Sequence, residues 1–334
     1  MRTPTISLDR PRLFDLATSS IQKLAALNGE SGRFVYRYDA RTGTERYGYN
    51  ILRHFGAVWA INSAATGMAH ADEQRQRMVA VSERALNWAL KEHLVELNGC
   101  GTCLAEDGFV KLGAAALAVV AILTCPAPAI REHEDVARRL CEFVVASYDA
   151  RKGAFVDKRR VSDGSVSSFR SEYYTAQACF ALMMAGALLS EPSLLNFAYE
   201  VLLRISRAEY GVSVQNHWML YAIDLANKYR SSPDFEKYAI SFLSSIASDT
   251  IYRARGITPV SCRTEALSLI LTILAGRNFI TEQKLARTIA VENIQFQSLG
   301  FLPSGAVRNS FRTYDVRIDY IQHNAMSILG YLRC

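Results

Sequence analysis

The stretches KLGAAALAVVAIL (residues 111–123) and IREHEDVARRLCEFVVASY (residues 130–148) follow one another in the chain and differ in charge. The first stretch is apolar on almost every side of a helix, so we expect it to be buried all round. The second repeats apolar residues every three or four positions between charged ones, as a helix with one face in water does. Together they predict an inner helix followed by an outer helix.

The same alternation recurs along all 334 residues. Helices are expected to begin near residues 11, 50, 72, 111, 129, 171, 191, 216, 233, 262, 280 and 319, each next to Gly, Pro, Ser, Asp or Asn. Every second helix is unusually apolar, at a period that leaves room for two helices and a loop, which indicates an array of helical hairpins. We therefore predict an all-α fold, an (α/α)6 barrel of six helical hairpins with short β-hairpins in the long loops at one rim. Residues 1–334 are expected to form this toroid as a single domain.

The long connections are expected just before the inner helices, at residues 29–49, 94–110, 150–170, 209–215, 248–261 and 298–318. Two of them, around residues 32–49 and 102–112, have the alternation of β-hairpins. In a closed ring the inner helices run parallel, so their positive N-terminal ends meet at one rim, where an anion is favoured. Long loops at one rim usually build the functional surface.

Proton-carrying and anion-binding residues gather at these inner helix starts. Each also has a structural interpretation, as a helix cap, a first-turn acid or a hydrogen-bonded core histidine. The candidate catalytic residues are Tyr49, His54, Glu172, Tyr173, His217, Asp319, Tyr320 and His323. The candidate substrate-binding residues are Tyr47, Asn50, Arg53, Lys111, Trp218, Arg263, Glu265 and Arg317.

Composition narrows the classes of partner. Half of the residues are hydrophobic and 21% are charged, which is typical of a globular protein with a large core. The net charge of +6 tolerates an anionic ligand, but Lys and Arg are too scattered to predict a nucleic-acid surface. Because the first thirty residues hold no uninterrupted apolar run and the apolar run 114–123 is too short to span a bilayer, we expect a soluble cytoplasmic protein without a membrane partner.

The seven cysteines predict a reduced protein without a structural metal. Several lie in apolar helical stretches, where cysteine behaves as a small buried hydrophobe. Cys100 and Cys103 have CxxC spacing, but a lone CxxC without a second pair or a nearby histidine does not define a zinc site. We therefore expect no metal and no cofactor.

The helix rhythm resembles the (α/α)6 toroid superfamily, which includes six-hairpin glycosidases, polysaccharide lyases, sugar epimerases, terpenoid cyclases and lanthionine cyclases. A narrower resemblance joins the run Arg317-Ile-Asp319-Tyr320 to the helical catalytic domain of D-glucuronyl C5-epimerases. His323 does not have that family's histidine spacing, and its additional β-rich domain has no counterpart in this sequence. The aspartate-rich run of class II terpenoid cyclases is not found either, since Arg317 separates Asp315 from Asp319.

The resemblance implies a carbohydrate-active enzyme acting on an anionic, uronate-type sugar or oligosaccharide. Proton abstraction next to the carboxylate would give epimerisation or elimination, with Arg53, Arg263, Arg317 or Lys111 stabilising the charge. Two alternatives stay open. A hydrolase would use paired carboxylates from among Glu172, Glu265 and Asp319. A non-catalytic toroid would bind a glycan or peptide on an aromatic rim of Phe34, Tyr36, Tyr38, Tyr47 and Tyr49.

Overall fold

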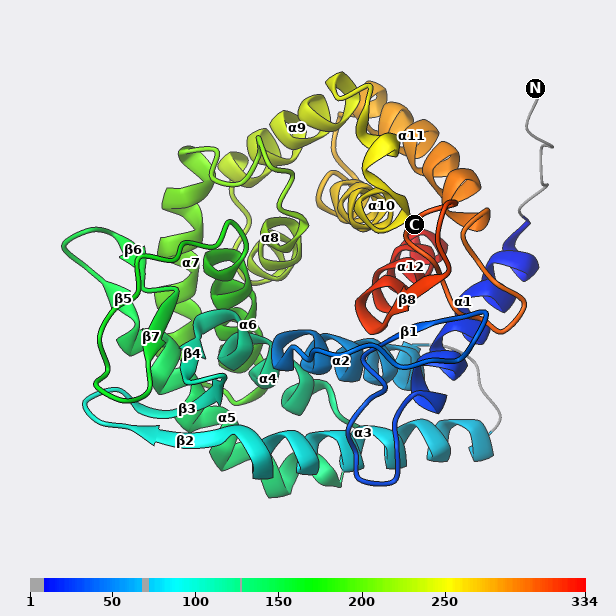
Figure 1. Cartoon of the computed structure of the whole chain (residues 1–334). Coiled ribbons are helices and arrows are strands. Elements are labelled where there is room, and N and C mark those ends of the chain that lie inside the picture. Colours follow the sequence, from blue (N-terminus) through cyan, green and yellow to red (C-terminus); the bar gives the residue numbers. More distant parts are fainter. Residues whose placement is uncertain (1–8, 68–71, 127) are drawn as a thin grey trace.

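A computed structural model describes residues 9–67, 72–126 and 128–334, and shows a ring of inner helices surrounded by outer helices (Figure 1). The inner helices are α2 (Ile51–Gly67), α4 (Leu112–Thr124), α6 (Tyr174–Leu188), α8 (His217–Tyr229), α10 (Ile257–Ile273) and α12 (Ile318–Arg333). The outer helices are α1 (Arg10–Ala26), α3 (Asp72–His93), α5 (Ala129–Ala146), α7 (Pro192–Arg207), α9 (Pro233–Ser248) and α11 (Ile280–Ser298). Because α12 packs against α2, the ring is closed, and the predicted (α/α)6 barrel is confirmed.

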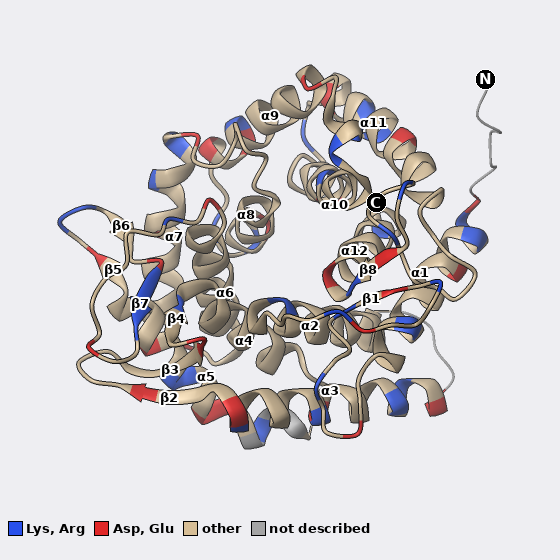
Figure 2. Ribbon diagram, in the orientation of Figure 1, with Lys and Arg blue, Asp and Glu red and all other residues tan. Residues whose placement is uncertain are grey.

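The difference in polarity between the two sets of helices explains the two layers. In α4 every residue from Leu112 to Leu123 is buried, between α2, α5 and α6. The outer helix α5 turns Leu140, Phe143 and Val144 to the core. Figure 2 shows the charged residues mainly on outer helices and loops, while the inner helices are mostly uncharged. None of the helices in the described part of the chain has the length and apolar character needed to cross a membrane.

Short antiparallel strands occupy the long loops. The strands are β1 (Arg37–Asp39), β2 (Leu94–Leu97), β3 (Gly101–Glu106), β4 (Phe109–Lys111), β5 (Tyr148–Asp149), β6 (Ala154–Phe155), β7 (Lys158–Arg160) and β8 (Asp315–Arg317). They pair as β1-β8, β2-β3-β4-β7 and β5-β6. The β1-β8 pair joins the first long loop to the last one, beside the point where α12 meets α2.

Both predicted hairpins are present. In the first long loop Tyr38 lies opposite Glu45, so the chain reverses around residues 39–44. In the second, Asp107 and Gly108 have φ of 51° and 75°, the left-handed conformation that a tight two-residue hairpin requires. The hairpin turns therefore follow from local sequence.

Two inner helices begin away from their predicted positions. Helix α6 begins at Tyr174 instead of near residue 171, because the backbone N–H of Ser171 donates to the Asp157 carboxylate (3.1 Å) and residues 171–173 stay in the loop. Helix α10 begins at Ile257 instead of near residue 262. Its first two N–H groups donate to Asn309, to the backbone carbonyl and to Oδ1 at 2.9 Å each. A residue of the last long loop thus caps α10.

Candidate active site

A cavity of about 550 Å³ opens at the inner helix starts. All six inner helices or the loops before them contribute to its wall. The lining residues are Asn50, Leu52, Arg53, Leu117, Ser171, Tyr173, Tyr174, Gln177, Val214, Gln215, His217, Trp218, Arg255, Thr258, Pro259, Cys262, Arg263, Asn309, Arg317, Asp319, Tyr320, Gln322 and His323. Its volume lies within the range of small-molecule sites in proteins.

The structure brings most of the predicted site residues to this cavity. Those that line it are Asn50, Arg53, Tyr173, His217, Trp218, Arg263, Arg317, Asp319, Tyr320 and His323. Glu265 is buried and lies against His323 without lining the cavity. Residues from four inner helices and from loops far apart in sequence therefore converge on one place.

The other predicted residues lie away from the cavity. The ring of Tyr47 is fully exposed, with a relative accessibility of 105%. Lys111 is paired with Glu106 (2.7 Å). Glu172 is exposed, and its backbone carbonyl accepts a hydrogen bond from Asn216 Nδ2 (2.7 Å).

Tyr49 and His54 are held in the core instead. His54 is buried; its Nδ1 lies 2.8 Å from the Tyr49 hydroxyl and its Nε2 lies 3.0 Å from the Ala85 carbonyl oxygen. The ring also packs against Phe34 and Trp88. Burial lowers the pKa of His54 to about 3, so this histidine is neutral at ordinary pH. These contacts match the structural interpretation of His54.

Four functional groups meet at the floor of the cavity, and we call His217, Cys262, Glu265 and His323 the floor cluster. One potential ligand atom from each lies within 4.8 Å of all the others. His323 Nδ1 is 2.8 Å from Glu265 Oε1, and the Tyr221 hydroxyl donates to Glu265 Oε2 (2.6 Å). Glu265 therefore holds the His323 ring in one orientation.

His217 faces His323 across the floor cluster. The two ring centroids are 5.2 Å apart and the planes are nearly perpendicular, at 86°. His217 is only 3% exposed, yet its Nε2 has no hydrogen-bond partner within the described residues. A buried polar atom without a partner is uncommon and indicates a group that a ligand can engage.

The surroundings separate the pKa values of the two histidines. Burial, together with the nearby His323, lowers the pKa of His217 well below its usual range. Burial alone would also lower the pKa of His323, but Cys262 and Glu265 raise it well above the usual range. Two titratable groups with pKa values moved in opposite directions form a natural base and acid. These directions favour the neutral form of His217 and the protonated form of His323.

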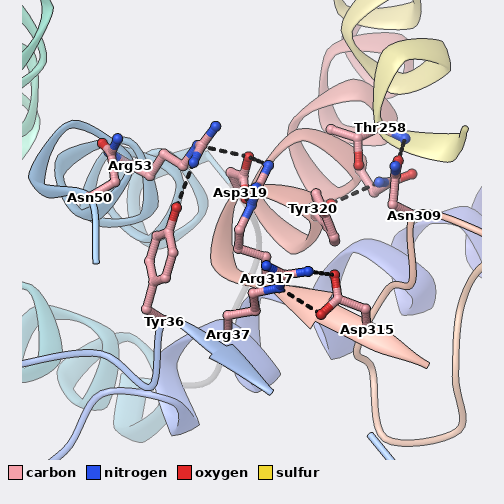
Figure 3. Close-up of polar contacts among 11 residues, drawn as sticks. Tyr36, Arg37, Asn50, Arg53, Thr258, Asn309, Asp315, Arg317, Asp319 and Tyr320 are labelled. Atoms are coloured by element: carbon pink, nitrogen blue, oxygen red, sulfur yellow. Dashed lines mark hydrogen bonds and ion pairs between the residues drawn. The ribbon is translucent and has the colours of Figure 1, made fainter. Parts of the chain in front are cut away.

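A basic cluster lies at the start of α12, and we call Arg53, Arg317 and Asp319 the α12 basic cluster (Figure 3). Both arginines pair with the one carboxylate: Arg53 Nε lies 3.1 Å from Asp319 Oδ2, and Arg317 Nη2 lies 2.7 Å from the same oxygen. Arg53 also donates to the Tyr36 hydroxyl (2.5 Å). Two guanidinium groups against one carboxylate leave a net positive charge, which favours an anionic group in the cavity.

The floor cluster is also where a metal ion would bind, among the described residues. Imidazole nitrogen, thiolate sulfur and carboxylate oxygen are all donors that Zn²⁺ accepts. Cys100 and Cys103, the CxxC pair, belong to the β2-β3 hairpin instead. Burial raises the pKa of the Cys103 thiol to about 12 and also raises the pKa of the Cys262 thiol, so the thiolate that a metal needs is disfavoured at both cysteines without a bound ion.

Sequence analysis did not single out Cys262, Tyr221, Arg255 or Asn309. Cys262 and Glu265 are three residues apart on α10, so a shared helix face was a usable signal. Asn309 gave no local signal, because its role depends on contact with a helix about fifty residues earlier.

Comparisons with known proteins support the fold. No family model matches the sequence, and no curated protein shows a significant match. A D-mannose isomerase structure matches with a TM-score of 0.70 and 11% identity over 99% of both chains. The structure of a sugar epimerase from a ruminal bacterium matches with a TM-score of 0.71 and 12% identity, over 96% of this chain and 98% of that chain. The structure of an unsaturated glucuronyl hydrolase specific for heparin matches with a TM-score of 0.63 and 11% identity, over 96% of this chain and 95% of that chain. At such identities the likeness shows a shared (α/α)6 toroid fold, while the narrower resemblance to D-glucuronyl C5-epimerases stays a prediction.

Proposed function

We propose that this protein is a carbohydrate-active enzyme that epimerises or isomerises an acidic sugar by proton transfer. His217 is the base and His323 is the acid. The observation that carries the proposal is that the Nε2 atom of buried His217 has no partner among the described residues, while the His217 ring lies against a His323 ring held by Glu265. Two of the proteins with similar folds are named as a sugar epimerase and a sugar isomerase, which agrees with this reaction class.

The reaction begins at a carbon next to a carbonyl or carboxylate group of the sugar. His217 Nε2 takes the proton from this carbon, and the electron pair of the broken C–H bond moves onto the neighbouring oxygen atoms. The α12 basic cluster stabilises that negative charge. His323 then donates the proton that it already carries, to the same carbon in an epimerisation or to the neighbouring carbon in an isomerisation, and exchange with water restores both histidines. The product is an isomer of the substrate, so atoms and charge balance.

The hydrolase alternative is less well supported by the geometry. Glycosidases with two catalytic carboxylates place both beside the scissile bond. Within the described residues, Asp319 is the only carboxylate that lines the cavity, and two arginines occupy it. Glu265 is buried behind His323, and Glu172 lies outside.

The binding-module alternative loses three of its five predicted rim residues, while Tyr47 is exposed and Tyr49 is partly exposed. Phe34, Tyr36 and Tyr38 are all buried, so they offer no aromatic rim on which sugar rings could stack. Elimination shares the first proton abstraction with epimerisation, and the two differ only in whether the 4-substituent leaves. The test below separates them.

The test follows exchange at carbon. Uronic acids, their oligosaccharides and neutral aldoses are incubated with the protein in D2O and monitored by NMR, with ultraviolet absorbance as the readout for an unsaturated product. We expect deuterium at carbon without new reducing ends. Absorbance growth would make the enzyme a lyase, and new reducing ends with neither absorbance growth nor deuterium would refute proton transfer.

Matched histidine variants identify the acid and the base. H217Q and H323Q are each expected to lose at least about 100-fold in exchange rate, because each removes a group that moves a proton. H133Q is the control, since His133 lies on α5 away from the cavity and bonds to Asn87. Equal activity in all three variants would contradict the assignment.

A further inference from the structure

A second group of polar residues, two of them arginines, lines the same cavity at the start of α10, and we call Arg255, Thr258, Arg263 and Asn309 the α10 basic cluster. Arg255 ends the short 3-10 helix η1 (Tyr252–Arg255) that precedes α10. Both arginines pair with Asp249, Arg255 Nη1 at 3.2 Å from Oδ2. Arg255 and Arg263 line the cavity, whereas Asp249 does not. One positive charge remains in excess.

Two donors of this cluster have no partner in the described part of the chain. The Arg263 side chain is only 4% exposed; its Nε donates to Gln215 and its Nη2 pairs with Asp249, but its Nη1 has no hydrogen-bond acceptor. The hydroxyl of Thr258 is also buried and unpartnered. Buried donors without acceptors are rare in native structures and suit a ligand that brings oxygen atoms.

The backbone of α10 adds little to this attraction. The N–H groups of Ile257 and Thr258 are already used by Asn309, and Pro259 has none. An anion at this place would therefore be held by side chains, above all by Arg255 and Arg263. That dependence makes the cluster testable by substitution of single residues.

We propose that the α10 basic cluster binds a second acidic group of the substrate, in addition to the one held by the α12 basic cluster. This inference rests on the proposed function. It implies that the substrate is an acidic saccharide of at least two units with an acid group on each. Figure 3 shows Thr258 and Asn309 beyond Tyr320, on the side away from Arg53, so the two clusters occupy separate parts of the site. The cavity volume of about 550 Å³ suits a ligand larger than a single sugar ring.

The first experiment locates the anion itself. Crystals of the protein are soaked in selenate, whose anomalous signal marks its position. We expect selenate between Arg255 and Arg263 in the wild-type protein and in R253A, and no selenate there in R255A. Arg253 is a matched control, because it belongs to the same 3-10 helix but pairs with Glu292 (3.0 Å) away from the cavity. Wild-type crystals without selenate at this cluster, or R255A crystals that keep it, would overturn the proposal.

The second experiment measures how much the second acid group of the ligand contributes to binding affinity. Calorimetric titration compares a disaccharide of two glucuronic acid units with glucuronyl-glucose, which has the same length and one carboxylate. The wild-type protein and R253A should bind the doubly acidic disaccharide about tenfold more tightly, the effect of one charged hydrogen bond. In R255A the two affinities should become equal. A wild-type protein that binds both alike, or neither, refutes the second subsite.

These outcomes are independent of the proposed reaction. Binding is measured without turnover, so a preserved tenfold preference with no deuterium exchange on any sugar would reject the proton-transfer function and keep the subsite. Deuterium exchange on a single uronic acid, with equal affinity for the two disaccharides, would keep the proton-transfer function and reject the second subsite.

Discussion

His217 and His323 show at the scale of single residues how surroundings divide one kind of side chain into a base and an acid. The proposed reaction needs His217 neutral and His323 protonated, and their pKa values are lowered and raised, respectively. We therefore expect kcat/KM to be level around neutral pH, to fall in acid as His217 gains a proton, and to fall in alkali as His323 loses one. A pH-rate profile checks this. A profile that falls on only one side of neutral pH would contradict the assignment of one histidine as base and the other as acid.

Replacing Glu265 with Gln should move one limb of that profile. Glu265 is one of the groups that raise the pKa of His323, so its neutral analogue lets His323 lose the proton at lower pH. In E265Q the alkaline limb should shift to lower pH while the acid limb stays. Y221F, which removes only the hydrogen bond to Glu265, should shift it less. A slower enzyme with an unmoved alkaline limb would show that Glu265 only supports the fold.

His54 should make the protein sensitive to acid. Its pKa is about 3 in the folded protein and near 6.5 when unfolded. As pH falls from about 6.5 towards 3, the unfolded state takes up a proton that the folded state does not, so the free energy of unfolding falls by up to about 1.4 kcal/mol per pH unit. Urea denaturation across this range should show a shallower decline in H54Q than in H133Q. If the free energy of unfolding declined equally with falling pH in both variants, His54 would not be the cause of the acid sensitivity.

The sequence could place histidines at inner helix starts but not tell which face of each helix they occupy. His54 and His323 both lie in the first turns of apolar inner helices, yet one is packed between aromatic rings and the other lines the cavity. An inner helix that is apolar on all sides has no polar stripe to mark the face that lines a site. Cys262 was missed for the same reason, because a cysteine in such a helix reads as a small hydrophobe.

At the scale of elements, the helices were predictable because each carries its own period and its own start signals. Helix α9, for example, begins at Pro233 after Ser232, whose hydroxyl accepts from the Asp234 N–H (3.2 Å). Helix α10 was misplaced because its cap is supplied by Asn309, from another loop. A cap that comes from a distant segment leaves no mark in the local sequence.

Asn309 should therefore control the stability of α10. N309A removes the oxygen that accepts from the Thr258 N–H, and loss of such a cap costs about 1 kcal/mol. N309D keeps an acceptor at the same place and should retain most of the stability. Urea denaturation of the three proteins measures the difference. If N309A were as stable as the wild type, solvent would be capping the helix equally well.

At the scale of the whole molecule, ring closure should make the helices unfold together. Helix α12 packs against α1, α2 and α10, and the β1-β8 pair is reinforced by Arg37, whose Nε and Nη2 lie 2.7 and 3.1 Å from the Asp315 carboxylate. We expect residues 1–334 to behave as one domain, with a single calorimetric transition whose van't Hoff and calorimetric enthalpies agree. Two resolved transitions would mean that the ring consists of separable units. R37A should lower the midpoint without splitting the transition.

The closing contact between α12 and α2 also sets when the binding site comes into existence during synthesis. Arg53 leaves the ribosome early, whereas Asp319 and His323 follow more than 250 residues later in the printed sequence. A nascent chain that has made five of the inner helices still exposes apolar inner faces, and its Arg53 has Tyr36 as a partner but lacks Asp319. We expect such a chain to have an open edge for chaperones to cover, and a truncated product that ends before α12 to lack the proposed ligand site.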